Sequence, residues 1–282
     1  MKSLSDNFTL SNGVQIPCVG FGTWQTPDGE IAVSSVLEAI ARGYRHIDTA
    51  AGYQNEQSVG VAVKKCGVPR KELFITSKLA NTDHGYEATH KAFELTMKKL
   101  DMDYLDLYLI HWPNPLPFRD RWKEANAGTW KAFEELYTAG KIRSIGISNF
   151  LPHHTDALLE TAKIAPMVNQ IRLCPGETQP AVSAYCNAHN ILLEAYSPLG
   201  TGLVFDIPEM QALSSKYGKT IAQICLRWSL QMGYLPLPKS VTASRIKENT
   251  EIFDFELTDS DVKTIAGMKD SGSTKDPDTV PF

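Results

Sequence analysis

The sequence predicts an α/β fold, a closed (β/α)8 TIM barrel preceded by an N-terminal β-hairpin. Short runs rich in β-branched and aromatic residues alternate with longer runs of helical period, and eight such units follow one another. The length of 282 residues agrees with the roughly 250 residues that are typical of this barrel. No repeat, low-complexity tract or proline-rich linker divides the chain, so a single domain is expected over residues 1–282.

Each expected element has its own signal. The turn dipeptide Asn12-Gly13 predicts a hairpin over about residues 8–16. The expected barrel strands are the apolar runs Val19–Gly22, His46–Thr49, Leu73–Lys78, Leu105–His111, Ile142–Ser148, Met167–Ile171, Ile191–Tyr196 and Leu235–Lys239. The expected helices are Glu30–Arg42, Gln54–Lys65, Thr89–Leu100, Thr129–Ala139, His153–Lys163, Gln179–His189, Ile221–Gln231 and one that begins near Ser244. A short polar tail is expected over about residues 268–282.

An open, doubly wound sheet is the structural alternative. Such a sheet normally carries a GxGxxG turn after its first strand, where a pyrophosphate approaches the backbone. This chain offers only Gly20-Phe21-Gly22, and Trp24 stands where close approach would need glycine. The barrel is therefore favoured.

Composition and charge exclude several classes of function. The formal net charge of −4 argues against general binding to nucleic acid or to anionic membranes, which requires a basic surplus. No apolar run approaches the length of a membrane span, and residues 1–7 lack the apolar core of a signal peptide. The five cysteines are odd in number and widely spaced, which is typical of reduced thiols. A cytoplasmic protein is expected.

The ends of the expected strands are rich in polar and aromatic side chains. In (β/α)8 barrels the chemistry lies at the C-terminal ends of the strands and on the loops that follow. The residues at these ends are Trp24, Asp48, Lys78, His111 with Trp112, Ser148 with Asn149, Asn169 with Gln170, Tyr196 with Ser197, and Lys239 with Ser240. A purely structural rim would not require such residues, so a functional site is expected there.

Proton transfer is the chemistry that the first half of the chain predicts. Tyr53, on the loop after the second barrel strand, is the candidate acid, although a phenol with a pKa of about 10 donates a proton poorly at neutral pH. The Lys78 ammonium would stabilise its phenolate, and Asp48 would keep that ammonium charged and oriented. The alternatives are a structural ion pair for Asp48 and Lys78, and a loop aromatic for Tyr53.

His111 and two tryptophans complete the expected pocket. Beside the other three groups, His111 is placed to donate a hydrogen bond to a carbonyl oxygen, whereas alone it would be taken as a core residue. Trp24 and Trp112 would wall the substrate pocket, with core packing as the alternative. There is no GxSxG motif and no set of metal ligands, so neither a nucleophile nor a metal site is expected. A redox cofactor would then supply the reactive group.

The second half of the chain is typical of a cradle for such a cofactor. Tyr196 could stack on a flat ring, and residues 197–202 form a loop able to fold over a pyrophosphate. The hydroxyl and amide groups suited to a carboxamide belong to Ser148, Asn149 and Gln170. The run from Lys239 to Arg245 is basic and rich in hydroxyls, which favours a phosphate. Its alternative is a solvated lysine with an arginine on a helix surface.

Three long motifs in this chain resemble the signatures of the aldo-keto reductase family. Gly43–Glu56 resembles the first signature, Tyr104–Pro113 the second, and Leu237–Asn249 the third. They occur in the family's order, and the resemblance extends from the first hairpin to about Phe255. The resemblance implies a (β/α)8 barrel that binds NADP(H) in extended form and reduces carbonyl compounds.

The resemblance also implies roles for individual residues. It assigns the catalytic tetrad to Asp48, Tyr53, Lys78 and His111, with Tyr53 as the proton donor. It places the carboxamide and nicotinamide beside Ser148, Asn149, Gln170 and Tyr196, and the rest of the cofactor beside Ser197, Leu199, Gly200, Lys239, Ser240, Val241, Thr242, Arg245, Glu248 and Asn249. Lys239 and Arg245 favour NADP(H) over NAD(H), because their charge would neutralise the 2′-phosphate.

The chain length and the short tail resemble the compact microbial branch that includes 2,5-diketo-D-gluconate reductases and aldehyde reductases. A monomer acting on a small-molecule carbonyl substrate is therefore expected. One alternative is a glycoside hydrolase that uses Asp48 and Glu194, but Lys78 and Tyr53 would then have no role. The other is a regulatory NADPH-binding protein on the same fold, and the intact tetrad argues against a loss of catalysis.

Overall fold

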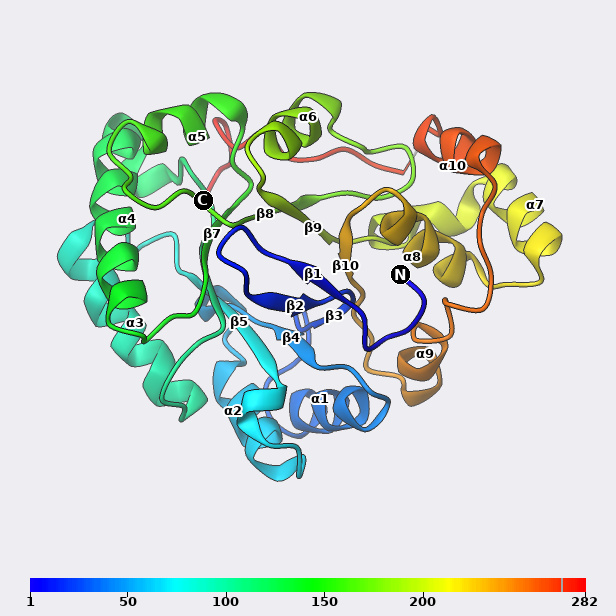
Figure 1. Ribbon diagram of the computed structural model, residues 1–282, viewed down its shortest axis with the longest axis horizontal. Helices are drawn as coiled ribbons and strands as arrows, with labels where there is room; N and C mark the ends of the chain where they lie inside the picture. Colours follow the sequence, from blue (N-terminus) through cyan, green and yellow to red (C-terminus); the bar gives the residue numbers. More distant parts are fainter. Residues whose placement is uncertain (270) are drawn as a thin grey trace.

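The chain folds into a barrel of parallel strands that is surrounded by helices (Figure 1). The computed structural model describes residues 1–269 and 271–282. The barrel strands are β3 (Gly20–Gly22), β4 (His46–Asp48), β5 (Phe74–Leu79), β6 (Leu107–Ile110), β7 (Ile145–Ser148), β8 (Val168–Arg172), β9 (Leu192–Tyr196) and β10 (Leu235–Leu237). They pair in parallel in sequence order from β3 to β10, which confirms the predicted barrel. A doubly wound sheet would reverse its strand order, so that alternative is wrong.

The first and last barrel strands, β3 and β10, pack closely because β3 carries glycine at two positions, Gly20 and Gly22. The backbone N–H of Gly22 donates to the Pro238 carbonyl at 2.9 Å, which joins β3 to the end of β10. A Cβ atom at Gly20 would lie 2.4 Å from the Leu237 side chain and 2.6 Å from the His46 ring. Any larger residue at Gly20 would therefore force β3 away from its neighbours. The GxG pair thus serves strand packing and not a GxGxxG turn.

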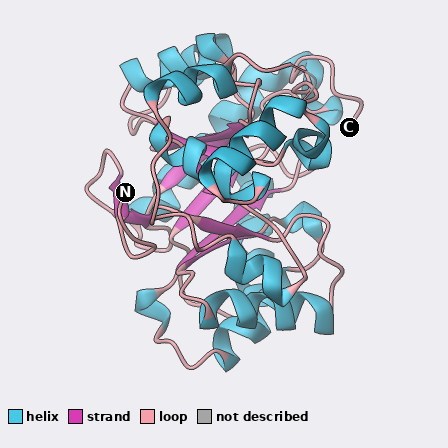
Figure 2. Ribbon diagram, turned by 90° about the vertical axis from the view of Figure 1, so that its right-hand side faces the viewer, coloured by secondary structure: helices cyan, strands magenta, loops and turns pink. Residues whose placement is uncertain are grey.

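Helices follow the barrel strands and cover the outside of the barrel (Figure 2). They are α1 (Glu30–Ala41), α2 (Glu56–Lys65), α3 (Tyr86–Leu100), α4 (Trp122–Thr138), α5 (Pro152–Leu159), α6 (Pro180–Ala188), α8 (Ile221–Gln231) and α9 (Ala243–Glu248). Among residues 1–269 and 271–282, no helix has the length and apolar character needed to cross a membrane.

Several helix predictions need correction. The prediction lacks α7 (Pro208–Tyr217) and α10 (Asp259–Ala266), which bury few residues: α7 buries Met210 and Leu213, and α10 buries Ile265. α3 begins at Tyr86, three residues before the expected start, and α4 begins at Trp122, seven residues before the expected Thr129. Gly128 weakens the helical pattern of α4 in the sequence, because glycine is a poor helix former. In the structure a side chain at this position would be crowded, since a Cβ atom there would lie 3.1 Å from the Tyr86 backbone N. The glycine lets α3 and α4 approach each other.

The N-terminal hairpin and the C-terminal tail lie at opposite ends of the barrel (Figure 2). The hairpin pairs β1 (Asn7–Thr9) with β2 (Gln15–Pro17), and its Asn12 side chain donates to the Arg143 carbonyl just before β7 begins. The tail instead contacts the loop after β6, where Asn114 donates to Asp278 at 2.9 Å. The hairpin therefore covers the end where the strands begin, and the tail borders the end where they finish.

Candidate active site

A buried lysine connects a carboxylate to a phenol at the C-terminal ends of β4 and β5. Lys78 Nζ donates to both Asp48 carboxylate oxygens at 2.7 and 2.8 Å. The same ammonium contacts the Thr49 carbonyl at 3.0 Å and the Tyr53 hydroxyl at 3.1 Å. Tyr53 reaches it from the short 3-10 helix η1 (Ala51–Tyr53), which follows β4 directly. Three of the four residues predicted for catalysis therefore form one hydrogen-bonded chain.

The charges in this chain are set by burial and by proximity. Burial lowers the pKa of the Lys78 ammonium, but the neighbouring Asp48 and Tyr53 outweigh it and raise that pKa above its usual value. Lys78 therefore stays charged. Burial raises the pKa of the Tyr53 hydroxyl above its usual value, and the Lys78 charge acts in the opposite direction. The lysine thus offsets the cost of burying the phenolate and does not by itself make Tyr53 a strong acid.

His111 lies beside Tyr53, with ring centroids 5.7 Å apart and planes at 74°. Burial, with a smaller contribution from the Lys78 charge, lowers the pKa of His111 to about 3. The ring is neutral at physiological pH and still has one N–H to donate. Of the two predicted pocket tryptophans, Trp112 is 8% exposed and packs edge-on against Phe282 of the tail, whereas Trp24 is 47% exposed.

The four residues predicted to hold a nicotinamide also form one cluster. Ser148 Oγ donates to the Gln170 carbonyl at 2.7 Å, and Tyr196 donates to Asn149 Oδ1 at 2.9 Å. Asn149 Nδ2 contacts Ser148 Oγ and the His111 carbonyl, both at 3.0 Å. Asn149 has a φ of 62°, a left-handed conformation that asparagine tolerates better than most residues. The cluster therefore joins β7, β8 and β9 to the end of β6.

The other predicted cofactor residues lie after β9 and β10. Ser197, Leu199 and Gly200 form the turn into the 3-10 helix η4 (Gly200–Asp206), where the Gly200 N–H donates to the Ser197 carbonyl at 2.9 Å. After β10, Ser240 Oγ accepts from the Thr242 N–H at 3.1 Å, and Val241 is exposed.

Lys239 and Arg245 are both exposed. In the described ranges 1–269 and 271–282, neither has a carboxylate within 4.0 Å. Glu248 accepts from the Thr220 hydroxyl at 2.8 Å, so its side chain is tied to the start of α8. Asn249 is 4% exposed.

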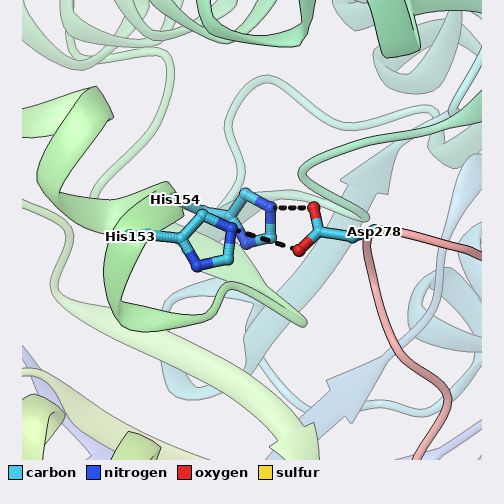
Figure 3. A group of neighbouring side chains, drawn as sticks. All are labelled: His153, His154 and Asp278. Carbon is cyan, nitrogen blue, oxygen red and sulfur yellow. Dashed lines mark hydrogen bonds and ion pairs between the residues drawn. The ribbon is translucent and has the colours of Figure 1, made fainter.

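Asp278 anchors the C-terminal tail to the loop after β6 and to α5, and Figure 3 shows its contacts with the two histidines of α5. Its Oδ1 accepts from Asn114 Nδ2 at 2.9 Å and from His154 Nε2 at 2.8 Å, and its Oδ2 lies 3.2 Å from His153 Nε2. His153, His154 and Asp278 have the spacing of a metal site. However, the Leu151 N–H donates to His154 Nδ1, which leaves the ring proton on Nε2, the atom that would have to bind a metal. The group is therefore suited to holding the tail.

Glu194 and the tail are functional candidates that the sequence reasoning missed or misplaced. Glu194 is fully buried and accepts from Gln170 Nε2 at 2.8 Å. An acid with no exposed surface cannot reach a sugar substrate, so the glycoside hydrolase alternative finds no support here. One feature of the sequence did indicate a different role for Glu194, because it is an acid inside an otherwise apolar strand.

The C-terminal tail also contacts the loop after β6, where the Phe282 carbonyl accepts from the Leu116 N–H. No local pattern in the sequence predicts this contact, because contacts of the tail depend on tertiary structure.

Comparisons with known proteins agree with this geometry. The model of the aldo/keto reductase family matches residues 18–270. A glyoxal reductase of Bacillus subtilis is 47% identical over 99% of both chains, and a methylglyoxal reductase of Escherichia coli is 43% identical over 97% of this chain and 96% of its own. The crystal structure of a Bombyx mori aldo-keto reductase in complex with NADP is 36% identical, covers 93% of this chain and 91% of its own, and superposes with a TM-score of 0.84. The chain therefore belongs to the aldo/keto reductase family and is an oxidoreductase that acts on carbonyl compounds.

Proposed function

We propose that this protein reduces small reactive aldehydes and dicarbonyls with NADPH, and that Tyr53 is the proton donor. The observation that carries the proposal is the buried contact of the Lys78 ammonium with both the Asp48 carboxylate and the Tyr53 hydroxyl. The names of the glyoxal and methylglyoxal reductases, which this chain resembles over nearly its whole length, favour short dicarbonyl substrates.

The residues of the site fit a phosphorylated dinucleotide. The cluster of Ser148, Asn149, Gln170 and Tyr196 combines amide and hydroxyl groups with one aromatic ring, as a carboxamide on a flat ring requires. Lys239 and Arg245 are exposed cations, and an anionic ligand such as the 2′-phosphate would balance their charge. When bound, NADPH would supply the hydride for the reduction.

Each member of the tetrad then has a distinct task. Neutral His111 donates a hydrogen bond that orients the substrate carbonyl and stabilises negative charge on its oxygen. Tyr53 protonates that oxygen, and the Lys78 ammonium, 3.1 Å from the phenol oxygen, stabilises the phenolate that remains. Asp48 holds the ammonium in place through two short contacts.

A turnover assay with matched tyrosine variants tests the proposal. Purified protein is expected to oxidise NADPH in the presence of glyoxal, methylglyoxal or 4-nitrobenzaldehyde. Tyr53→Phe is expected to reduce kcat by about 10²–10⁴-fold, the usual contribution of a general acid. NADPH affinity, measured by quenching of tryptophan fluorescence, should be nearly unchanged. Tyr185→Phe removes a hydroxyl that contacts Asp156 at 2.5 Å outside the site, and it should behave as the wild type.

Two outcomes would contradict the proposal in different ways. Normal turnover by Tyr53→Phe would remove Tyr53 from the role of acid. Tight NADPH binding without turnover of any carbonyl compound in a broad panel would instead favour a regulatory NADPH-binding protein on the same fold.

A further inference from the structure

A hydrogen-bonded chain continues from the tetrad into the barrel and ends on a second acid, Glu194. Glu194 lies on β9 directly opposite Gln170 of β8, and its side chain is fully buried. Gln170 Nε2 contacts Glu194 Oε2 at 2.8 Å and Asp48 Oδ2 at 2.9 Å. Because Asp48 is bound to Lys78, and Lys78 to Tyr53, Glu194 is connected to the phenol through three intervening side chains.

The two acids determine the orientation of the Gln170 amide. A glutamine amide has two N–H hydrogens on nitrogen and only lone pairs on oxygen. Here both hydrogens are used, one for each carboxyl group. A flipped amide would place its oxygen against the Asp48 carboxylate, which can only accept, and this is unfavourable. Only the carbonyl oxygen of the Gln170 side chain therefore remains available to a ligand, and it can accept a hydrogen bond from a carboxamide N–H.

Within residues 1–269 and 271–282, no charged group contacts Glu194 directly, and the more distant Lys78 ammonium only partly offsets the cost of ionising it. His46 of β4 is the nearest basic group, with Nε2 3.9 Å from Glu194 Oε1, and this nitrogen also contacts Thr76 Oγ1. Burial and the Lys78 charge lower the pKa of His46 to about 3, so its ring is neutral. In the described part of the chain, the contacts of Lys78 Nζ are with Asp48, Thr49 and Tyr53.

The remaining neighbours also disfavour ionisation of Glu194. Asp48 of β4 carries a like charge on the other side of the Gln170 amide, and β10 offers Leu235 opposite Glu194. Burial, followed by the Asp48 charge, raises the pKa of Glu194 to about 8. A fully buried carboxylate with one amide donor would be costly, so the neutral acid is the form that the fold accommodates at pH 7.

We propose that Glu194 is a positioning residue of this reductase: as an uncharged acid it fixes the Gln170 amide and leaves one negative and one positive charge beneath Tyr53. Ionisation of Glu194 would add a second negative charge to the chain. That charge would raise the pKa of Tyr53 further and make the phenol a weaker proton donor. This inference rests on the proposed function, because Tyr53 must be the donor for its acidity to limit turnover.

The pH dependence of kcat separates this role from a merely structural one. In the wild type, kcat for methylglyoxal reduction is expected to fall about tenfold as the pH rises through about 8, the effect of one pKa unit on the donor. Glu194→Gln cannot ionise but can still accept from Gln170, so its kcat should lack this decrease. Glu56→Gln, at a buried acid that contacts Ser77 at 2.7 Å, is the matched control and should keep the wild-type profile. Identical profiles for the wild type and Glu194→Gln would overturn the proposal.

Two further measurements do not depend on turnover. The infrared spectrum at pH 7 should contain a carboxylic-acid C=O band that is absent from Glu194→Gln and disappears from the wild type as the pH rises through about 8. Glu194→Leu removes the acceptor for one Gln170 hydrogen, and its NADPH dissociation constant is expected to rise about tenfold. Absence of the band would refute the uncharged acid even in an active enzyme. Presence of the band in a protein that turns over no carbonyl would leave the Glu194 assignment standing and refute the proposed function.

Discussion

Lys78→Met should destabilise the fold as well as stop catalysis. The substitution keeps the length of the side chain but removes an ammonium that is fully buried and contacts both oxygens of Asp48. The Asp48 carboxylate, 3% exposed, then retains Gln170 Nε2 as its side-chain donor within the described residues. Breaking a buried ion pair in this way costs about 3–5 kcal/mol of the free energy of unfolding. For a chain of this size that loss corresponds to a Tm decrease of roughly 6–10 °C.

A second substitution tests whether the unpaired charge is the cause. Asp48→Asn in the Lys78→Met background removes that charge, and it is expected to recover about 2 kcal/mol or more without restoring turnover. The free energies come from urea unfolding followed by tryptophan fluorescence. The reasoning fails if Lys78→Met loses less than about 1 kcal/mol, or if adding Asp48→Asn deepens the loss.

Three other predictions concern the cofactor, the tail and pH. Arg245→Ala should raise the NADPH dissociation constant about tenfold or more and that for NADH little; equal losses in fluorescence titrations would refute the 2′-phosphate assignment. Asp278→Ala leaves the buried His154 N–H unpaired and should lower the free energy of unfolding by about 1–3 kcal/mol. Asp276→Ala, at a residue whose contacts are local, is its control in urea unfolding. Burial lowers the pKa of His46 to about 3 and those of His84 and His154 to about 4. These histidines take up protons below about pH 6.5 in the unfolded chain but not in the folded one. The free energy of unfolding should therefore fall from about pH 6.5 toward about pH 4.5, by up to roughly 1.4 kcal/mol per pH unit for each histidine. A free energy of unfolding in urea that does not change over this pH range would contradict the prediction.

The fold was predictable because its signals are local. Every expected strand overlaps a barrel strand, since each carries a short apolar run between polar turns. The helix errors arise where a helix buries few residues or where a tertiary contact selects a poor helix former. α10 buries Ile265 alone, and α4 contains Gly128, which is present for its contact with Tyr86 and not for helix propensity. The reason for Gly20 likewise depends on Leu237, more than two hundred residues away, and no local pattern contains it.

The grouping of Asp48, Tyr53 and Lys78 was predictable for a geometric reason. Parallel strands finish at one end of a barrel, so polar residues at strand ends must converge there. The directions in which the pKa values of these groups shift were not predictable in the same way. The proximity of Lys78 to Tyr53 follows from topology, whereas the net direction of the Tyr53 pKa depends on how deeply the phenol is buried. Glu194 shows the same limit, because a strand position predicts where an acid lies but not whether it is ionised.

The balance between burial and charge explains why a neutral acid is useful beneath this site. Tyr53 is a weak acid in a buried position, and the Lys78 ammonium is the opposing contribution in its immediate contact. Asp48 is needed to hold that ammonium, but its charge already raises the pKa of Tyr53. A second carboxylate would raise the pKa of Tyr53 still further, and an alkyl group would give Gln170 no acceptor. Glu194 as an acid supplies the acceptor at neutral pH, and the gain of charge at high pH is the property that the Glu194→Gln variant removes.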